Sequence, residues 1–116
     1  MNSKIIVYHN EMIENYNKIT QLCLMMNIEI ILINDQMLQN KIKDILNKKI
    51  KKSKNKKINH AVVIFSNINT KQMDRILDLL KDNLQLCLKA IVTATNYQWS
   101  FDKLDQHLME EYQKNN

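Results

Sequence analysis

The chain has 116 residues and a formal net charge of +5, and its hydrophobic share of 45% and charged share of 25% are those of one ordinary globular domain. It contains no glycine and no proline. This excludes the glycine-rich phosphate-binding loops and the nucleophile elbow of hydrolases, because those turns need residues without a Cβ atom.

The first part of the chain predicts strands and helices in alternation. A β-branched apolar run predicts a buried strand over residues 4–8, and apolar residues spaced by three and four predict a helix over 11–26. A second apolar run predicts a strand over 28–33, and a second helix is expected over 35–47. This half of the chain, residues 1–47, is therefore expected to have the order β-α-β-α.

A strongly basic segment follows at residues 48–57, KKIKKSKNKK, with seven of the 17 basic residues of the chain. Such a segment could contact phosphate groups, although it has no interleaved aromatic residue that would stack on a base. A solvated linker between two halves explains it equally well. The candidate phosphate contacts are Lys48, Lys49, Lys51, Lys52, Lys54, Lys56 and Lys57.

The second half, residues 58–116, repeats the alternation. It predicts a strand over 60–65, a helix capped by Asn69 or Thr70, a strand over 88–93 and a last helix that begins at Ser100. The apolar stripe of the third helix extends to Leu84 and is expected to face the core. The whole chain therefore reads as one domain, residues 1–116, with the basic segment at its middle.

The two halves also resemble each other in sequence. IIVYHN at 5–10 aligns with VVIFSN at 62–67, which indicates an internal duplication, although any two strand–helix units share part of such a pattern. The alternation predicts an α/β domain of three layers, with a four-stranded, mainly parallel sheet and helices on both faces. The strand order 2-1-3-4 fits both the duplication and an open sheet.

Without glycine, helix ends need another residue for the left-handed conformation. Asparagine is the next choice, so we expect it at Asn27, Asn47 and Asn83, where the first three helices should stop. The turn after the fourth strand is expected to depend on Asn96, which can take a left-handed or an Asx-turn conformation.

In parallel sheets, ligands bind beyond the carboxyl ends of the strands. The residues expected to line such a crevice are His9, Asn10, Ser66, Asn67, Thr93, Thr95, Asn96 and Trp99. A structural role remains open for part of this set. Ser100 can cap the last helix, and Trp99 and Leu104 have the spacing of a hydrophobic staple.

No catalytic residue, metal site or cofactor is predicted. His9 and His60 are expected at opposite ends of parallel strands, so they should not meet. Cys23 and Cys87 form no metal-binding or redox motif and are expected to be buried free thiols.

The second half contains the short runs AVVIF (61–65), KAIVTATN (89–96) and MEEY (109–112), together with Trp99 and Leu104. In these residues the chain resembles a family of bacterial proteins known as domain of unknown function 3783, over residues 60–112. The chain has Ala94 where the family pattern has proline. The resemblance implies a strand, a turn and a helix that begins after a tryptophan, and it implies no activity.

The sequence therefore predicts a small cytoplasmic bacterial protein, without a leader or a membrane span, that acts as a non-enzymatic interaction or regulatory module. A homodimer is one expected form. The alternative is weak, non-specific binding of nucleic acid, or binding of a small anionic ligand, through the basic segment and the predicted crevice.

Overall fold

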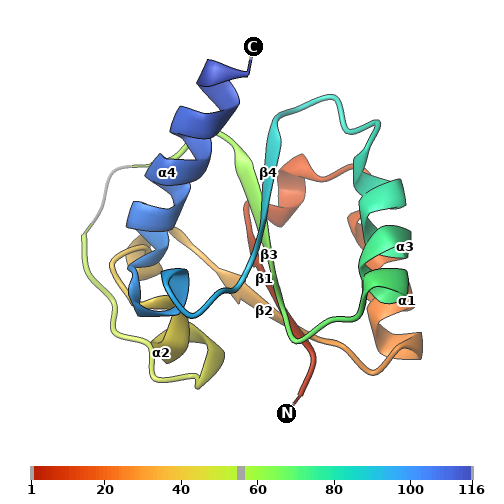
Figure 1. Cartoon of the computed structure of the whole chain (residues 1–116), viewed down its shortest axis with the longest axis horizontal. Helices are drawn as coiled ribbons and strands as arrows, with labels where there is room; N and C mark the ends of the chain where they lie inside the picture. Colours follow the sequence, from red (N-terminus) through yellow and green to blue (C-terminus); the bar gives the residue numbers. More distant parts are fainter. Residues whose placement is uncertain (1, 55–56, 116) are drawn as a thin grey trace.

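A computed structural model describes residues 2–54 and 57–115, in which one four-stranded sheet lies between two layers of helices (Figure 1). The strands are β1 (Lys4–Tyr8), β2 (Glu29–Ile33), β3 (Ala61–Ser66) and β4 (Cys87–Ile91). The helices are α1 (Tyr16–Met25), α2 (Ile42–Leu46), α3 (Thr70–Leu80) and α4 (Phe101–Lys114). This order confirms the α/β class.

The first two helices are shorter than their apolar stripes. Short 3-10 turns, η1 (Asn10–Met12) and η2 (Asp35–Met37), occupy part of the range that the periodicity assigned to α-helix. In the second case, the Asn34 side chain accepts a hydrogen bond from the backbone N–H of Gln36 and starts η2. Lys41 is then extended, so α2 begins only at Ile42. A third 3-10 turn, η3 (Asn96–Gln98), precedes α4.

The strand order β2-β1-β3-β4 confirms the predicted order, but the sheet is mixed. The pairs β1–β2 and β3–β4 are parallel, whereas the central pair β1–β3 is antiparallel, with Ile6 opposite Ile64. The prediction of a mainly parallel sheet is therefore wrong at the centre of the sheet.

The path of the basic segment explains this reversal. The Lys4 ammonium donates a hydrogen bond to the carbonyl of Leu46, so α2 ends beside the start of β1. Ile58 lies at the other end of β1, where its carbonyl accepts a hydrogen bond from the Tyr8 hydroxyl. Ten extended residues span about 33 Å, which is more than the roughly 17 Å of a five-residue strand. The segment therefore makes one extra pass along the sheet, and β3 starts where β1 ends.

Helices cover both faces of the sheet, as predicted. On one face, α1 and α3 pack over the side chains of Ile5, Val7, Val63 and Phe65 (Figure 1). On the other face, α2 and α4 pack over the alternate side chains of the same two strands, Ile6, Tyr8, Val62 and Ile64. The central strands are buried on both sides, which explains their continuous apolar runs.

The two halves are related by an approximate twofold axis perpendicular to the sheet. Near this axis, Lys41 and Ser100, the residues that precede α2 and α4, form an antiparallel bridge. The backbone N–H of Ile42 donates to the carbonyl of Trp99 at 2.8 Å, and the N–H of Phe101 donates to that of Asn40 at 2.9 Å. These reciprocal bonds join the halves where their second helices begin.

The twofold relation corrects the alignment of the two halves by one residue. Ile5 faces α1 and α3, as does Val63, whereas Val62 faces α2 and α4. Because side chains alternate along a strand, a shift of one residue changes the face. The structural counterpart of Ile5 is therefore Val63, and the sequence alignment that paired it with Val62 is wrong.

The left-handed positions are only partly those predicted. Asn27 has φ 58°, as expected, but Asn47 is right-handed and Lys48 takes the left-handed position instead, with φ 58°. Asn83 is not among the described residues with positive φ. Its amide donates hydrogen bonds to the carbonyls of Met12 and Gln85, so it ties the end of α3 to the first half.

Candidate functional site

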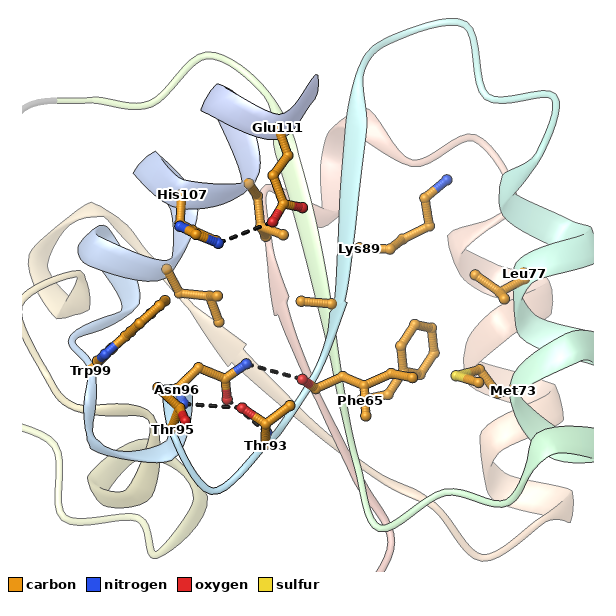
Figure 2. Close-up of a pocket in the computed structure, with 14 residues that line it drawn as sticks. Phe65, Met73, Leu77, Lys89, Thr93, Thr95, Asn96, Trp99, His107 and Glu111 are labelled. Carbon is orange, nitrogen blue, oxygen red and sulfur yellow. Dashed lines mark hydrogen bonds and ion pairs between the residues drawn. The ribbon is translucent and has the colours of Figure 1, made fainter. Parts of the chain in front are cut away.

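A groove lies between α3 and α4, over the outer strand β4 (Figure 2). Its cavity has a volume of about 570 Å³. The α3 side of the groove is formed by Phe65, Met73 and Leu77. The α4 side is formed by Trp99, Leu104 and Leu108. Both walls are thus largely apolar, which is typical of ligand and peptide sites.

The floor of the groove is the free edge of β4. The N–H of Ala61 donates to the carbonyl of Leu86, and the N–H of Val92 donates to that of Phe65. Backbone groups alternate in direction along a strand, so the intervening residues Cys87, Lys89 and Ile91 direct theirs away from β3. Among the described strands none pairs with this edge, because β4 is the last strand of the sheet.

The turn after β4 depends on Asn96, which is buried. Its side-chain oxygen accepts a hydrogen bond from the N–H of Thr93 at 2.8 Å, and its amide donates to the carbonyl of Ile91 at 3.0 Å. The N–H of Asn96 donates in turn to the Thr93 hydroxyl. The turn therefore depends on Asn96, as expected, but the expected conformation is wrong. The Asn96 oxygen bonds to a residue three positions earlier and not to one two positions later, as an Asx turn requires, and Asn96 is not among the described residues with positive φ. The contact with Ile91 also covers one carbonyl at the end of the free edge.

Trp99 is half-buried in the α4 wall. The Lys103 ammonium lies 4.8 Å from the centre of its ring, and the His107 ring meets it edge-on at 5.3 Å. The predicted cap is confirmed, since the Ser100 hydroxyl accepts a hydrogen bond from the N–H of Lys103 at 3.0 Å. Trp99 and Leu104 pack in the same cluster, as a staple requires. Trp99 is therefore held in place with part of its ring at the groove.

The charged groups of the groove are compensated unequally. Glu111, on the α4 side, forms an ion pair with His107 at 3.0 Å. Lys89, in the middle of β4, is exposed and extends towards the α3 side (Figure 2). Among the described residues, Lys89 has no ion-pair partner within 4.0 Å. Among the described residues that line the groove, Lys89 is thus a cation without an ion-pair partner, in largely apolar surroundings.

The structure brings together half of the predicted crevice. Thr93, Thr95, Asn96 and Trp99 all line the groove. Ser66 and Asn67 line an adjoining cavity that Thr93 also lines.

His9 and Asn10 lie at the opposite end of the sheet, because β1 and β3 run in opposite directions. The expectation of a single crevice is therefore wrong for these two residues. The reason is the same extra pass of the basic segment that reverses β3.

A buried polar cluster occupies that opposite end. The Tyr8 hydroxyl donates a hydrogen bond to the Asp35 carboxylate, and burial together with this bond raises the pKa of Tyr8. His60 and Asp105 form a buried pair at 2.6 Å. His9 contacts the carbonyl of Ile58 at 2.6 Å, so His9 and His60 lie at the same end of the sheet, contrary to expectation.

This cluster has the character of a structural element. It fastens the end of the basic segment and α4 to the sheet, and sequence gave no signal for its pairings. Among the described residues, no group of three or more His, Cys, Asp or Glu side chains is placed to hold a metal ion.

The basic segment is anchored at its start. Lys48 pairs with Glu29, and this bond lowers the pKa of the Glu29 carboxyl. Asn40 accepts a hydrogen bond from the N–H of Lys51 and donates one to its carbonyl. The side chains of Lys49, Lys51, Lys52, Lys54 and Lys57 are exposed, whereas Lys56 lies outside the described residues.

Sequence reasoning missed the apolar walls of the groove. Met73 and Leu77 belong to the same stripe as Ile76 and Leu80, which are buried, so all were expected in the core. Leu84 lies beyond the end of α3 and is 88% exposed, which corrects its predicted burial. One available signal was Lys89, because a lysine inside an apolar strand is typical of an outer strand.

Residues 61–114 match the family model described as Domain of unknown function (DUF3783). The matched range contains β3, α3, β4 and α4, and so includes the floor and both walls of the groove. No curated protein matches the chain, and no solved structure matches it. Within the described residues, none of the helices combines the length and apolar character needed to cross a membrane.

Proposed function

We propose that this protein is a cytoplasmic bacterial interaction module, related to the family that its second half matches, and that it binds an extended polypeptide segment along the free edge of β4. The observation that carries this proposal is the position of that edge at the floor of an apolar groove. An edge alone is common, but an edge between two apolar walls offers a bound strand contacts on three sides.

The backbone of β4 supplies the first set of contacts. Cys87 and Lys89 each direct an N–H and a carbonyl outwards, and Ile91 directs its N–H outwards while its carbonyl is taken by Asn96. An added strand would form main-chain hydrogen bonds with these groups. Domains that bind by strand addition gain affinity from such bonds, which do not depend on the sequence of the partner.

The walls supply the second set of contacts. Alternate side chains of an added strand point to opposite faces of the sheet. One set would pack against Trp99, Leu104 and Leu108, and the other against Met73 and Leu77. The partner is therefore a segment with apolar residues at successive positions, and burial of its side chains contributes about 25 cal/mol per Å² of apolar area.

We favour binding over catalysis because the polar groups at the groove already have structural tasks. The side-chain oxygen and the side-chain nitrogen of Asn96 each form a hydrogen bond within the turn, and the Thr93 hydroxyl accepts a bond from the N–H of Asn96. Glu111 is paired with His107. Among the described residues that line the groove, these contacts leave no hydroxyl or thiol hydrogen-bonded to a general base.

The test uses peptides selected from a random display library on the purified protein. Trp99 is the only tryptophan of the chain, so its fluorescence reports binding at the groove directly. Lys89→Pro removes an outward N–H of β4 and leaves the bonds to β3 intact. Leu32→Pro is the matched control, since the N–H of Glu29 bonds to Ser3 and that of Leu32 therefore points away from β1.

Selected peptides should bind the wild type and Leu32→Pro, and should lose at least about tenfold in affinity for Lys89→Pro. Circular dichroism shows whether each variant is folded. If Lys89→Pro does not fold, Leu77→Lys places a charge in the wall without a change to β4. Unchanged binding by a folded variant of either kind would refute the proposal.

A second candidate is weak, non-specific binding of nucleic acid by the basic segment. It is favoured by the exposed lysines, which lie on a segment anchored to the body by Asn40. Residues 48–54 of the segment run beside α2, on the side of the molecule away from the groove (Figure 1). Such binding would be independent of the groove and would weaken steeply with salt.

Replacement of Lys49, Lys51, Lys52 and Lys54 by serine tests this candidate, with Lys48 kept because it pairs with Glu29. We expect salt-sensitive retention on heparin and single-stranded RNA to fall, since fewer counterions are released on binding. Retention equal to that of the wild type would exclude the segment as the contact.

A further inference from the structure

We infer that the segment bound in the groove carries an acidic side chain that faces Lys89, within an otherwise apolar strand. This inference rests on the proposed function and adds the chemistry of the partner. It is drawn from the position, exposure and missing counter-charge of one residue.

Lys89 lies at the centre of the available edge. It is the middle residue of β4, it lines the groove, and its backbone groups point outwards between those of Cys87 and Ile91. Glu111 is the only acidic side chain among the described residues that line the groove, and it is paired with His107. On α3, Asp78 is engaged by Lys81 at 2.8 Å.

An added strand would remove water from Lys89. Burial of an ammonium group without a partner is costly, because the group loses its hydration and gains nothing in return. A carboxylate on the added strand would offset this cost, because it would accept a charge-assisted hydrogen bond from the Lys89 ammonium. Directly opposite residues of an antiparallel pair have Cβ atoms about 5 Å apart, so the acidic residue belongs opposite or diagonal to Lys89.

The same residue argues against a second copy of this chain as the occupant. The free backbone groups of β4 are centred on Lys89, so symmetric pairing of two β4 strands would place two lysines against each other. Like charges at opposite positions destabilise a strand pair, and a lysine on an outer strand is a common protection against self-association. Lys89 therefore opposes β4 self-pairing and favours an acidic partner.

The experiment compares two synthetic seven-residue strand peptides of alternating valine, isoleucine and threonine, identical except for glutamate or lysine at the centre. Trp99 fluorescence gives both dissociation constants. We expect the wild type to bind the glutamate peptide about fivefold to tenfold more tightly. Lys89→Ala should bind both peptides equally, and Lys89→Glu should prefer the lysine peptide.

Two results of the peptide comparison would overturn the inference. One is equal affinity of the wild type for both peptides, or failure to bind the glutamate peptide. The other is a preference for glutamate that persists in Lys89→Ala. A dimer seen by sedimentation that Lys89→Pro dissociates would also overturn it, because the second copy would then occupy the edge.

The failure of the inference can be separated from that of the proposed function. If Lys89→Pro abolishes binding of both peptides while their affinities for the wild type are equal, strand addition stands and the acidic preference falls. If folded Lys89→Pro binds the glutamate peptide as tightly as the wild type does, neither the outward N–H nor the ammonium group of residue 89 contributes to binding. That result would refute both the proposed function and the inference.

Discussion

The two halves of the molecule have nearly the same order of elements, but they differ in the length of their last helix and in what covers their outer strand. In each, a parallel strand pair is followed by a 3-10 turn, an extended residue at the twofold axis and a helix. The helix is α2 in the first half, with five residues, and α4 in the second, with fourteen. The first half is closed by the basic segment, whereas the second leaves a groove along its outer strand.

The residues around the two turns show how this difference arises. In the first half, Leu38 is fully buried and Asn40 holds the basic segment through the backbone of Lys51. In the second half, Asn96 holds only its own turn, and Trp99 keeps part of its surface at the groove. A groove therefore forms where a long helix passes an outer strand that no further segment covers.

The outer strands themselves are more alike than their surroundings. Leu32 on β2 is 49% exposed and Ile91 on β4 is 54% exposed, so apolar exposure does not separate the two edges. Charge does separate them. Glu29 on β2 is paired with Lys4 and Lys48, whereas Lys89 on β4 has no such partner among the described residues.

The largest expected contrast is between core truncations in the two turns. Leu38→Ala should lower the free energy of unfolding by about 2–5 kcal/mol, because it leaves a cavity among fully buried neighbours. Trp99→Ala should cost only about 1–2 kcal/mol, since the ring is already partly exposed. Urea unfolding followed by circular dichroism measures both. Equal costs would show that the groove wall is as tightly packed as the closed half.

The two buried asparagines should come next. Asn96→Ala and Asn40→Ala each leave backbone groups without a partner and should cost about 2–3 kcal/mol. Only the second should release the basic segment, which limited proteolysis between residues 48 and 54 would detect. Equal protease resistance of Asn40→Ala and the wild type would contradict the anchoring role.

The cysteines offer a test against pH. Burial raises the pKa of both Cys23 and Cys87 from the ordinary thiol value of 9.0 to about 11. The fold therefore favours the neutral thiols, and this contribution to stability is complete below pH 9 and is lost as the pH rises towards 11. Unfolding midpoints of the wild type should fall over this range, and less so in Cys87→Ala.

Thiol reactivity at pH 8 sharpens the comparison of the halves. Both thiols should react slowly with a disulfide reagent in the folded protein, because little thiolate is present. A peptide bound along β4 should slow Cys87 further and leave Cys23, on α1, unchanged. Equal protection of both cysteines would point to a general gain in stability rather than to cover of the β4 edge.

The smallest expected effect concerns the two residues at the twofold axis. The Ser100 side chain caps α4, whereas Lys41 makes no side-chain cap at the start of α2. Ser100→Ala should cost about 1 kcal/mol, and Lys41→Ser should stabilise the protein by up to about 1 kcal/mol. Thermal unfolding measures both. No gain from Lys41→Ser would show that α2 is too short for its cap to matter.

Features of the fold that depend on residues close together in the chain could be predicted from sequence patterns. The strands, the caps at Asn69 and Ser100, and the dependence of the turn after β4 on Asn96 all follow from side-chain chemistry within a few residues. The strand order followed from the repeat of elements and from the rules for crossovers. These features needed no knowledge of distant contacts.

The direction of β3 and the groove could not be predicted in this way. The antiparallel centre depends on where a lysine-rich segment without periodicity carries the chain. The groove depends on which residues of one apolar stripe are covered: Ile76 is buried, whereas Met73 on the same stripe lines the groove. Both are properties of how the elements assemble.

The pairing of β1 with β3 also sets the order of events during synthesis. β1 is made first, yet one of its sides stays open until Ala61–Ser66 has left the ribosome. The bridge between Lys41 and Ser100 forms later still. Contacts of such long sequence separation slow folding and expose strand edges to aggregation in the meantime. The first half of this chain is therefore expected to remain incompletely folded until the second half has been synthesised.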